Sequence, residues 1–320
     1  MKPELTRRHS LRMLAGLGWA PWAACGVAKA AATAGAPREL RLIMGVETAS
    51  GRQILQDLKL RYPGLVVEAE LPAPSSEARR NQGGVTQVAI GSAGLRRALE
   101  SGARGPLVSV LASSQVYRQL LAQEAGREKG TVTAIYAEAS PLAQLQLISA
   151  IFEGRANVGV LLSDASSYLE RPLRHAAAAT GLDLLVERVA PSVDVVRSLT
   201  RLRGAQVLLA VPDSALYTPD TLRAILESTY RRGMPVVGFS SATVAAGTLA
   251  TAYCSTDDVV ADLVDLLDGL GSPSAAEVLP EPRFPQYWRV AVNESVARSL
   301  GVPLNDRILR LGNRPTGRAG

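Results

Sequence analysis

Short apolar runs alternate along most of the chain with segments in which apolar residues recur at helical spacing. Each run ends at polar or turn-forming residues, as the buried strands of a parallel sheet do. The runs that predict strands are 40–46, 66–71, 86–90, 107–111, 131–136, 158–162, 184–189, 207–211 and 235–239. The segments between them predict helices; 50–61, for example, has Ile54, Leu55 and Leu58 on one face. This alternation predicts an α/β fold whose parallel sheets are covered by helices on both faces.

The alternation restarts near residue 140. Ser140-Pro141 predicts a helix start, because serine accepts hydrogen bonds from first-turn amides and proline tolerates the first helical position. We therefore predict two doubly wound parallel-sheet lobes. The strand 249–254 and the helix 257–270 are expected to return to the first lobe, and the strand 288–292 to the second.

These assignments define the expected domains. The first lobe is predicted to comprise 38–137 plus 242–275, and the second 138–241 plus 276–313. The chain would then cross between the lobes three times, with the second crossing at Phe239-Ser240-Ser241. A hinge of this kind would permit the lobes to close around a ligand.

Residues 1–30 have the features of a signal peptide. Arg7-Arg8 precedes an apolar run at 13–27, and 28–30 supplies the small residues of a cleavage site. A twin-arginine signal fits, and so does an ordinary Sec signal that carries two arginines. Lipidation at Cys25 is a further alternative, although a tryptophan stands where such sites usually have leucine. We expect the protein to be exported to the periplasm.

Composition narrows the function classes. Apolar residues make up 47% of the chain, which is enough for two cores. Segment 1–30 holds five of the 35 basic residues and one of the 29 acidic residues, so the remainder is close to neutral and offers no basic patch for nucleic acid. Outside that segment the only cysteine is Cys254, which we interpret as a buried strand residue. We therefore expect no disulfide, no metal site and no cofactor.

Candidate ligand-binding residues follow the ends of the predicted strands. In open α/β sheets ligands bind beyond the carboxyl ends of the strands, where the next helices present their amide groups. In the first lobe these candidates are Glu47, Thr48, Ser50, Ser113, Ser114, Tyr136 and Glu138. In the second lobe they are Asp164, Ser166, Asp213 and Ser240. We expect Ser240 to reach the same cavity as Thr48 and Ser113 from the opposite lobe.

Several candidates also have structural interpretations. Ser114 is interpreted first as a helix cap, as are Ser140 and Thr218. Glu138 is interpreted first as a solvated charge at the hinge. Tyr136 ends an apolar strand, so core packing is the first interpretation and stacking against a flat ligand is the alternative.

The carboxylates and hydroxyls suggest two ligand groups. Asp164 and Asp213 follow equivalent strand ends and could cap turns or together hold an ammonium group. No arginine stands at these strand ends, so a ligand carboxylate would be held by backbone amides and hydroxyls such as those of Thr48, Ser113 and Ser114.

A family resemblance runs through most of the chain after residue 30. Its motifs are Thr133-Ala134-Ile135-Tyr136 followed by Ser140-Pro141, Val158-Gly159-Val160-Leu161, Val236-Val237-Gly238-Phe239-Ser240, and Val292-Asn293 followed by 297–301. In this order they resemble the exported substrate-binding proteins of ABC importers of the tryptophan/tyrosine-binding type. The resemblance implies a type I periplasmic binding protein fold, a small organic ligand between two lobes and an ABC permease in the inner membrane as partner.

The chain departs from that family after its first strand, where Glu47-Thr48-Ala49-Ser50 replaces the more usual pattern, so tryptophan or tyrosine is not carried over as ligand. The predicted function is a monomeric, non-catalytic binding protein that delivers an amino acid-like or related metabolite to an ABC importer. A periplasmic sensor signalling to a membrane receptor or kinase is the alternative. An exported enzyme would depend on His175, which lies within a predicted helix, the wrong place for a triad base.

Overall fold

The computed structural model describes residues 40–68, 85–101, 105–124, 131–190, 193–270 and 279–315. The predicted signal peptide, with Cys25 and the paired arginines, lies outside these residues. In the part of the chain that is described, no helix combines the length and the apolar character that crossing a membrane requires.

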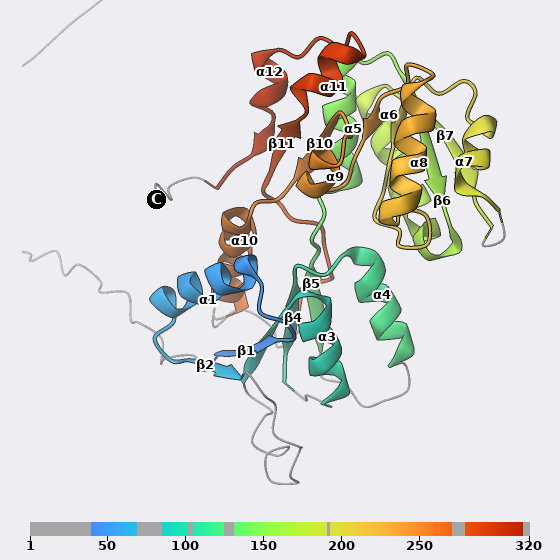
Figure 1. The fold of residues 1–320 in the computed structure, drawn as a ribbon. Helices are drawn as coiled ribbons and strands as arrows, with labels where there is room; N and C mark the ends of the chain where they lie inside the picture. The colour runs from blue at the N-terminus through green and yellow to red at the C-terminus, as the bar shows by residue number, and fades with distance from the viewer. Residues whose placement is uncertain are drawn as a thin grey trace, which may run out of the picture. The chain divides into compact units, whose positions relative to one another are not determined.

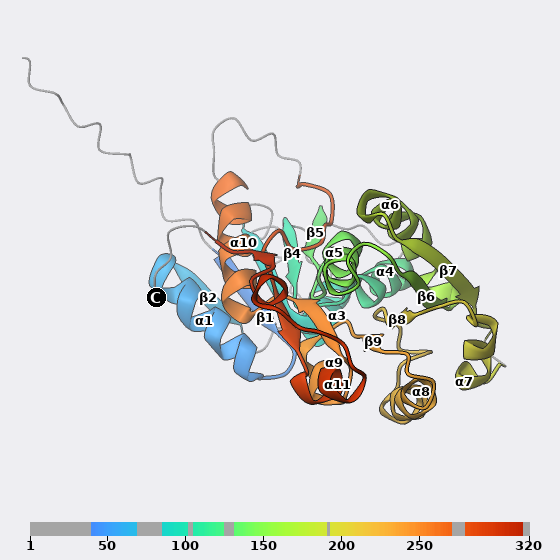
Figure 2. The ribbon, with the colours of Figure 1, turned by 90° about the horizontal axis from the view of Figure 1, so that it is seen from above.

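The first lobe is built on a parallel five-stranded sheet in the order β2-β1-β3-β4-β5. Its strands are β1 (Leu40–Met44), β2 (Leu65–Glu68), β3 (Thr86–Ile90), β4 (Leu107–Val110) and β5 (Val132–Ile135). Its helices are α1 (Ala49–Arg61), α3 (Gly91–Glu100), α4 (Ser114–Gln123) and, from later in the chain, α10 (Thr256–Leu270). One apolar cluster joins α1 and α10 to one face of the sheet, and a second joins α3 and α4 to the other. Figures 1 and 2 both show α1 beside α10.

The second lobe is built on a seven-stranded sheet in the order β12-β11-β10-β9-β8-β6-β7. Its strands are β6 (Asn157–Leu162), β7 (Asp183–Arg188), β8 (Val207–Leu209), β9 (Val236–Val237), β10 (Ala250–Tyr253), β11 (Trp288–Val292) and β12 (Gly312–Asn313). The strands β7, β6, β8, β9 and β10 are parallel to their neighbours in this order. At the other edge, β11 pairs antiparallel with β10 and with β12.

Helices cover both faces of this second sheet. They are α5 (Pro141–Ile151), the 3-10 helix η1 (Asp164–Leu169), α6 (Glu170–Thr180), α7 (Val195–Ser198), the 3-10 helix η2 (Leu199–Arg201), α8 (Pro219–Tyr230), α9 (Ser241–Ala245), α11 (Glu294–Ser299) and α12 (Asp306–Leu309). One core contains residues of α5, α6, α11 and α12, and another contains residues of α7 and α8. Ser140 and Thr218 cap α5 and α8, as the sequence predicted.

Strand β10 belongs to the second sheet, so the prediction that it returns to the first lobe is wrong. It pairs with β9 through Ala250 and Val237 and with β11 along four residue pairs. Phe239-Ser240-Ser241 is therefore not a crossing: Ser240 caps the short helix α9, after which the chain turns directly into the neighbouring strand of the same sheet. Helix α10 does pack on the first lobe, as predicted.

The second crossing consequently lies between β10 and α10, beside the other two. An isolated bridge pairs Glu138, just after β5, with Tyr253 at the end of β10. A second bridge pairs Ile135 with Arg283, on the segment that returns from α10 to β11. These pairings show that the three connecting segments run side by side.

Two buried ion pairs fix α10 to the returning segment. Asp258 accepts both guanidinium hydrogen bonds of Arg289 on β11, at 2.7 and 2.9 Å, and Asp262 is bound by Arg283. Both aspartates are fully buried. Asp258, in the first turn of α10, therefore has a specific partner on β11.

Candidate functional site

A cavity of about 700 Å³, counting space open to solvent, is lined by residues of both lobes. Its lining consists of Ser113, Gln115, Val116, Ala137 and Glu138 from the first lobe and Pro212, Asp213, Ser214, Tyr217, Phe239 and Ser240 from the second. These residues follow the carboxyl ends of β4, β5, β8 and β9. The cavity therefore lies where open α/β sheets bind ligands.

Glu138 is held by the first turn of α4. Ser113 is the N-cap of this helix and accepts a hydrogen bond from the Val116 amide at 3.3 Å. The Ser114 amide donates to Oε1 and Oε2 of Glu138 at 3.0 and 3.2 Å, and the Ser114 hydroxyl donates to Oε1. Two interpretations from the sequence are thus wrong. The helix cap is Ser113 and not Ser114. Glu138 is not a solvated charge but is buried, with 6% of its surface exposed.

Burial dominates the electrostatics of Glu138. Desolvation raises the pKa of its carboxyl above the ordinary value, because a charge removed from water is disfavoured. The hydrogen bonds from Ser114 offset this only in part. No ion pair connects Glu138 to a basic side chain within the described residues.

Polar contacts join the two lobes beside this carboxyl. The hydroxyls of Ser114 on α4 and Tyr168 on η1 lie 2.6 Å apart. The guanidinium of Arg118, also on α4, lies over the Tyr168 ring at 4.5 Å from its centroid. Gln115 accepts a hydrogen bond from the Ser214 amide at 3.1 Å. The start of α4 therefore contacts two separate elements of the second lobe.

Asp213 is the second buried carboxylate of the cavity, with 3% exposure, and its acceptor positions are filled. Oδ2 accepts from the Ser163 hydroxyl and the Ser166 hydroxyl, each at 2.6 Å, and from the Ser163 amide at 3.3 Å. Oδ1 accepts from the Ala215 amide at 2.9 Å and from the Gln115 side chain at 3.4 Å. Asp213 thus organises the loop ends around it.

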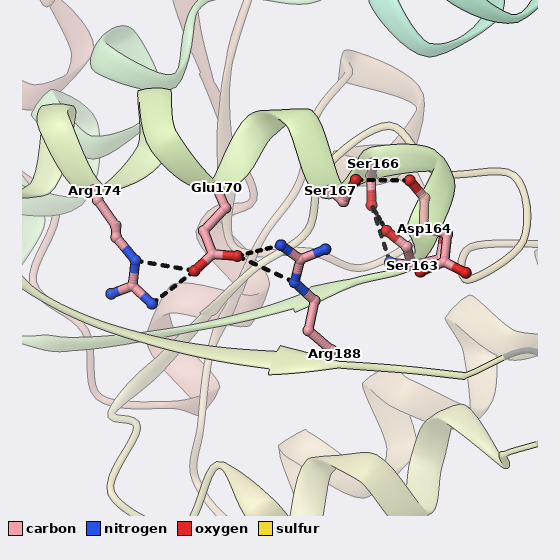
Figure 3. A network of polar contacts seen from close by, with 7 residues as sticks. All are labelled: Ser163, Asp164, Ser166, Ser167, Glu170, Arg174 and Arg188. Carbon is pink, nitrogen blue, oxygen red and sulfur yellow. Dashed lines mark hydrogen bonds and ion pairs between the residues drawn. The ribbon is translucent and has the colours of Figure 1, made fainter.

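Asp164 does not join this network. Figure 3 shows the turn at the start of η1, in which the Ser163 amide donates to the Ser166 hydroxyl at 3.1 Å. Asp164, the next residue after Ser163, is exposed, and its carboxylate makes none of the interactions drawn. The structure therefore does not pair Asp164 with Asp213 around one ammonium site.

A smaller, apolar pocket, with only about 20 Å³ of space for a water-sized molecule, adjoins the first and shares Glu138, Pro212 and Phe239 with it. Its other lining residues are Ala139, Pro141, Gln144, Leu169, Leu173, Leu209, Ala210, Val211 and Phe284. The Gln144 amide is already bonded to the β10 backbone, donating to the Ala252 carbonyl at 2.8 Å and accepting from the Ala252 amide at 3.0 Å. Glu138 is thus the polar group of this lining with acceptor capacity to spare.

Three solved structures align with most of this chain. A Streptococcus pneumonia protein described as an ABC domain in complex with L-Trp has a TM-score of 0.56 at 14% identity, covering 87% of this chain and 99% of that one. A substrate-binding protein with adhesive properties from Clostridium difficile, in its ligand-free, open structure, has a TM-score of 0.58 at 16% identity, covering 84% and 96%. A conserved domain protein from Vibrio cholerae has a TM-score of 0.54 at 18% identity, covering 86% and 98%.

The chain has the type I periplasmic binding protein fold. No family model and no curated protein matches the sequence, so the likeness rests on three-dimensional structure. At these identities it establishes the fold, and the ligand must be argued from the residues of the cavities.

Seven predicted site residues do not line either cavity: Ser114, Asp164 and Ser166, described above, and Glu47, Thr48, Ser50 and Tyr136. Thr48 is exposed and caps α1, accepting from the Gly51 amide at 3.0 Å, and Ser50 lies in the first turn of that helix. Glu47 is exposed and pairs with Arg52. Tyr136 is buried, with its ring packed edge-on against Phe284 at 5.2 Å between centroids, which supports the core interpretation. The expectation that Ser240 and Ser113 share a cavity holds, whereas Thr48 is not part of it.

Other residues of the site were missed in the sequence. Ser163 directly follows the end of β6 and could have been found by position. Gln115 is the second residue of α4 and Tyr168 the fifth of η1, positions that strand-end counting does not reach. Tyr217 is buried in the cavity wall, and its hydroxyl has no hydrogen-bond partner within the described residues. Those residues also contain no cluster of three or more acidic, histidine or cysteine side chains that could hold a metal.

Proposed function

We propose that this protein is an exported binding protein that captures a small organic solute between its lobes and delivers it to an ABC importer. The observation that carries the proposal is the cavity of about 700 Å³, whose wall combines Ser113 and Glu138 of one lobe with Asp213 and Ser240 of the other. A ligand there would bridge the lobes, and its contacts would stabilise the closed arrangement.

The arrangement supports binding in preference to catalysis. Asp213 is saturated by five donors, and Glu138 is held by the α4 amide and hydroxyl of Ser114. His175 is exposed on α6 and does not line the cavity. We include export by residues 1–30 to the periplasm and a monomeric state in the proposal, with the lobes divided as the strand pairing indicates.

A thermal-shift assay on the mature protein tests solute capture. A panel of amines, amino acids, sugars and organic acids is added, and a binder present at 100 times its Kd should raise the free energy of unfolding by about 2.7 kcal/mol. No stabilisation by any member of the panel would contradict the proposal.

A cavity-filling variant locates the binding. Ser214→Trp places a large ring in the wall of the cavity, whereas Ala215→Trp changes the adjacent exposed residue, which does not line it. We expect the first to abolish the ligand-dependent shift and the second to retain it.

Delivery is tested by adding the loaded protein to an importer in proteoliposomes: stimulation of ATP hydrolysis supports import, and binding without stimulation favours the sensor alternative.

A further inference from the structure

The two buried carboxylates of the larger cavity differ in their capacity for a ligand. Asp213 receives hydrogen bonds from Ser163, Ser166, Ala215 and Gln115, so a ligand would have to displace one of them. Glu138 receives hydrogen bonds from three donor groups, the Ser114 amide, the Ser114 hydroxyl and its own backbone amide. A carboxylate can accept about four hydrogen bonds. Of the two buried carboxylates, Glu138 is therefore the one with an acceptor position left for a ligand.

A cation is the ligand group that best complements the ionised form of this carboxyl. Glu138 is 6% exposed, and no basic side chain among the described residues lines either cavity. A buried carboxylate without a counter-charge is unfavourable, which agrees with the raised pKa of Glu138. An ammonium group would supply both the missing charge and hydrogen-bond donors.

The surroundings of Glu138 also define the rest of the ligand. The adjoining pocket walled by Leu169, Leu173 and Phe284 leaves only about 20 Å³ for a water-sized molecule, so it does not hold an apolar group of the ligand. The larger cavity has the room, and Val116, Pro212 and Phe239 give it an apolar wall beside Glu138. Within the part of the chain that the structure describes, a ligand carboxylate would meet two buried acidic residues and no arginine or lysine.

We propose that the ligand is a small apolar amine without a carboxylate, whose ammonium group binds Glu138 and whose apolar part lies against Val116, Pro212 and Phe239 in the larger cavity. This inference rests on the proposed function, because it specifies the solute that the same site captures. It departs from a free amino acid as ligand, since an amino acid brings the carboxylate that the site does not neutralise.

Matched probes test the ligand class on the wild-type protein. Isothermal titration compares 2-phenylethylamine with L-phenylalanine, which adds a carboxylate, and with 2-phenylethanol, which lacks the charge. Benzylamine, cyclohexylamine, isopentylamine and tryptamine vary the apolar part. We expect at least one amine to bind at least tenfold more tightly than its carboxylate-bearing or uncharged counterpart. Equal or tighter binding of the amino acid or the alcohol would overturn the inference, and so would the failure of every amine to bind.

A variant tests the role of Glu138. Glu138→Gln keeps the shape of the side chain and removes its charge, and Glu227→Gln makes the same change at an exposed position on α8. We expect the first to weaken amine binding at least tenfold and the second to leave it unchanged. Unchanged binding in a folded Glu138→Gln protein would overturn the inference. If sugars or organic acids bind while amines do not, the ligand class is wrong and the proposed function stands; if nothing binds, both fail.

Discussion

The hydroxyl of Tyr168 lies 2.6 Å from the hydroxyl of Ser114, so a hydrogen bond joins the second lobe to the first directly beside the buried carboxyl of Glu138. The Ser114 hydroxyl donates to Glu138 and accepts from Tyr168, which orients both bonds. Burial raises the pKa of Tyr168 to about 12, so its hydroxyl stays protonated at neutral pH and can donate.

Removing this donor should weaken the contact between the lobes. In Tyr168→Phe the ring and its contact with Arg118 are retained and the hydrogen bond is lost, at a cost of about 1 kcal/mol to the closed arrangement. We expect the mean distance between fluorescent labels on the two lobes to increase. Tyr230→Phe changes an exposed tyrosine on α8 and is the control. An unchanged distance in the Tyr168 variant would show that the hydrogen bond does not hold the lobes together.

The raised pKa of Glu138 should make stability depend on pH. Because the pKa in the folded protein lies above the ordinary value of 4.5, the folded state binds the proton more tightly than the unfolded state does. The contribution of Glu138 to the free energy of unfolding is fully present below pH 4.5, and it is lost as the pH rises through the folded-state pKa.

Glu138→Gln, which resembles the protonated carboxyl, should remove that part of the pH dependence. We expect the difference in the free energy of unfolding between Glu138→Gln and wild type to shift in favour of the variant as the pH rises from 4 to 7. Urea unfolding of both proteins across this range measures the difference. Glu227→Gln should follow the wild-type curve. Parallel curves for wild type and Glu138→Gln would contradict the prediction.

Asp213 should contribute mainly to the stability of the second lobe. Asp213→Ala leaves the hydroxyls of Ser163 and Ser166 without their shared acceptor in a buried site. We expect a loss of about 3 kcal/mol in the free energy of unfolding, since hydrogen bonds to charged groups are among the stronger ones. Asp183→Ala, at an exposed position at the start of β7, should change stability by less than about 0.5 kcal/mol. Equal effects of the two substitutions would assign Asp213 no structural role.

The ion pair between Asp258 and Arg289 should stabilise the hinge. Burial by itself would raise the pKa of the Asp258 carboxyl. The hydrogen bonds from Arg289 and Ser255 outweigh this effect and lower the pKa below the ordinary value. Arg289→Ala leaves a fully buried carboxylate unpaired and should cost about 3 kcal/mol. Arg310→Ala breaks the exposed pair with Asp306 and should cost less than about 1 kcal/mol. Chemical unfolding measures both, and similar losses would contradict this account.

The periodic apolar pattern predicted the alternating strands and helices correctly, because burial of a parallel strand on both faces leaves a continuous apolar run in the sequence. It could not assign β10 to a sheet. Ala250–Tyr253 has the composition of a buried strand in either lobe, and only its pairing with Val237 and with β11 decides the matter. The intervening helix α9 was too short to show whether the chain changed lobes there.

The site was predicted in part for the same reason. Counting strand ends found Ser113, Glu138, Asp213 and Ser240, because the carboxyl ends of parallel strands face one edge of each sheet. It also selected Thr48, which follows β1 in the same way and only caps a helix. Position after a strand is visible in the sequence, whereas the direction in which the next turn carries the side chain is not.

The sequence by itself determined the α/β class, the two-lobed organisation and the set of loops from which a site could be built, because these depend on local periodicity and on residue type. Only the tertiary structure decided which carboxylate is free to meet a ligand. Glu138 and Asp213 are both acidic residues near strand ends, and they differ because Asp213 is surrounded by donors from Ser163, Ser166 and Gln115, whereas Glu138 is buried beside an apolar cavity with Ser114 as its donor. Burial and hydrogen-bond saturation arise from segments distant in the chain, so they are properties of the folded protein.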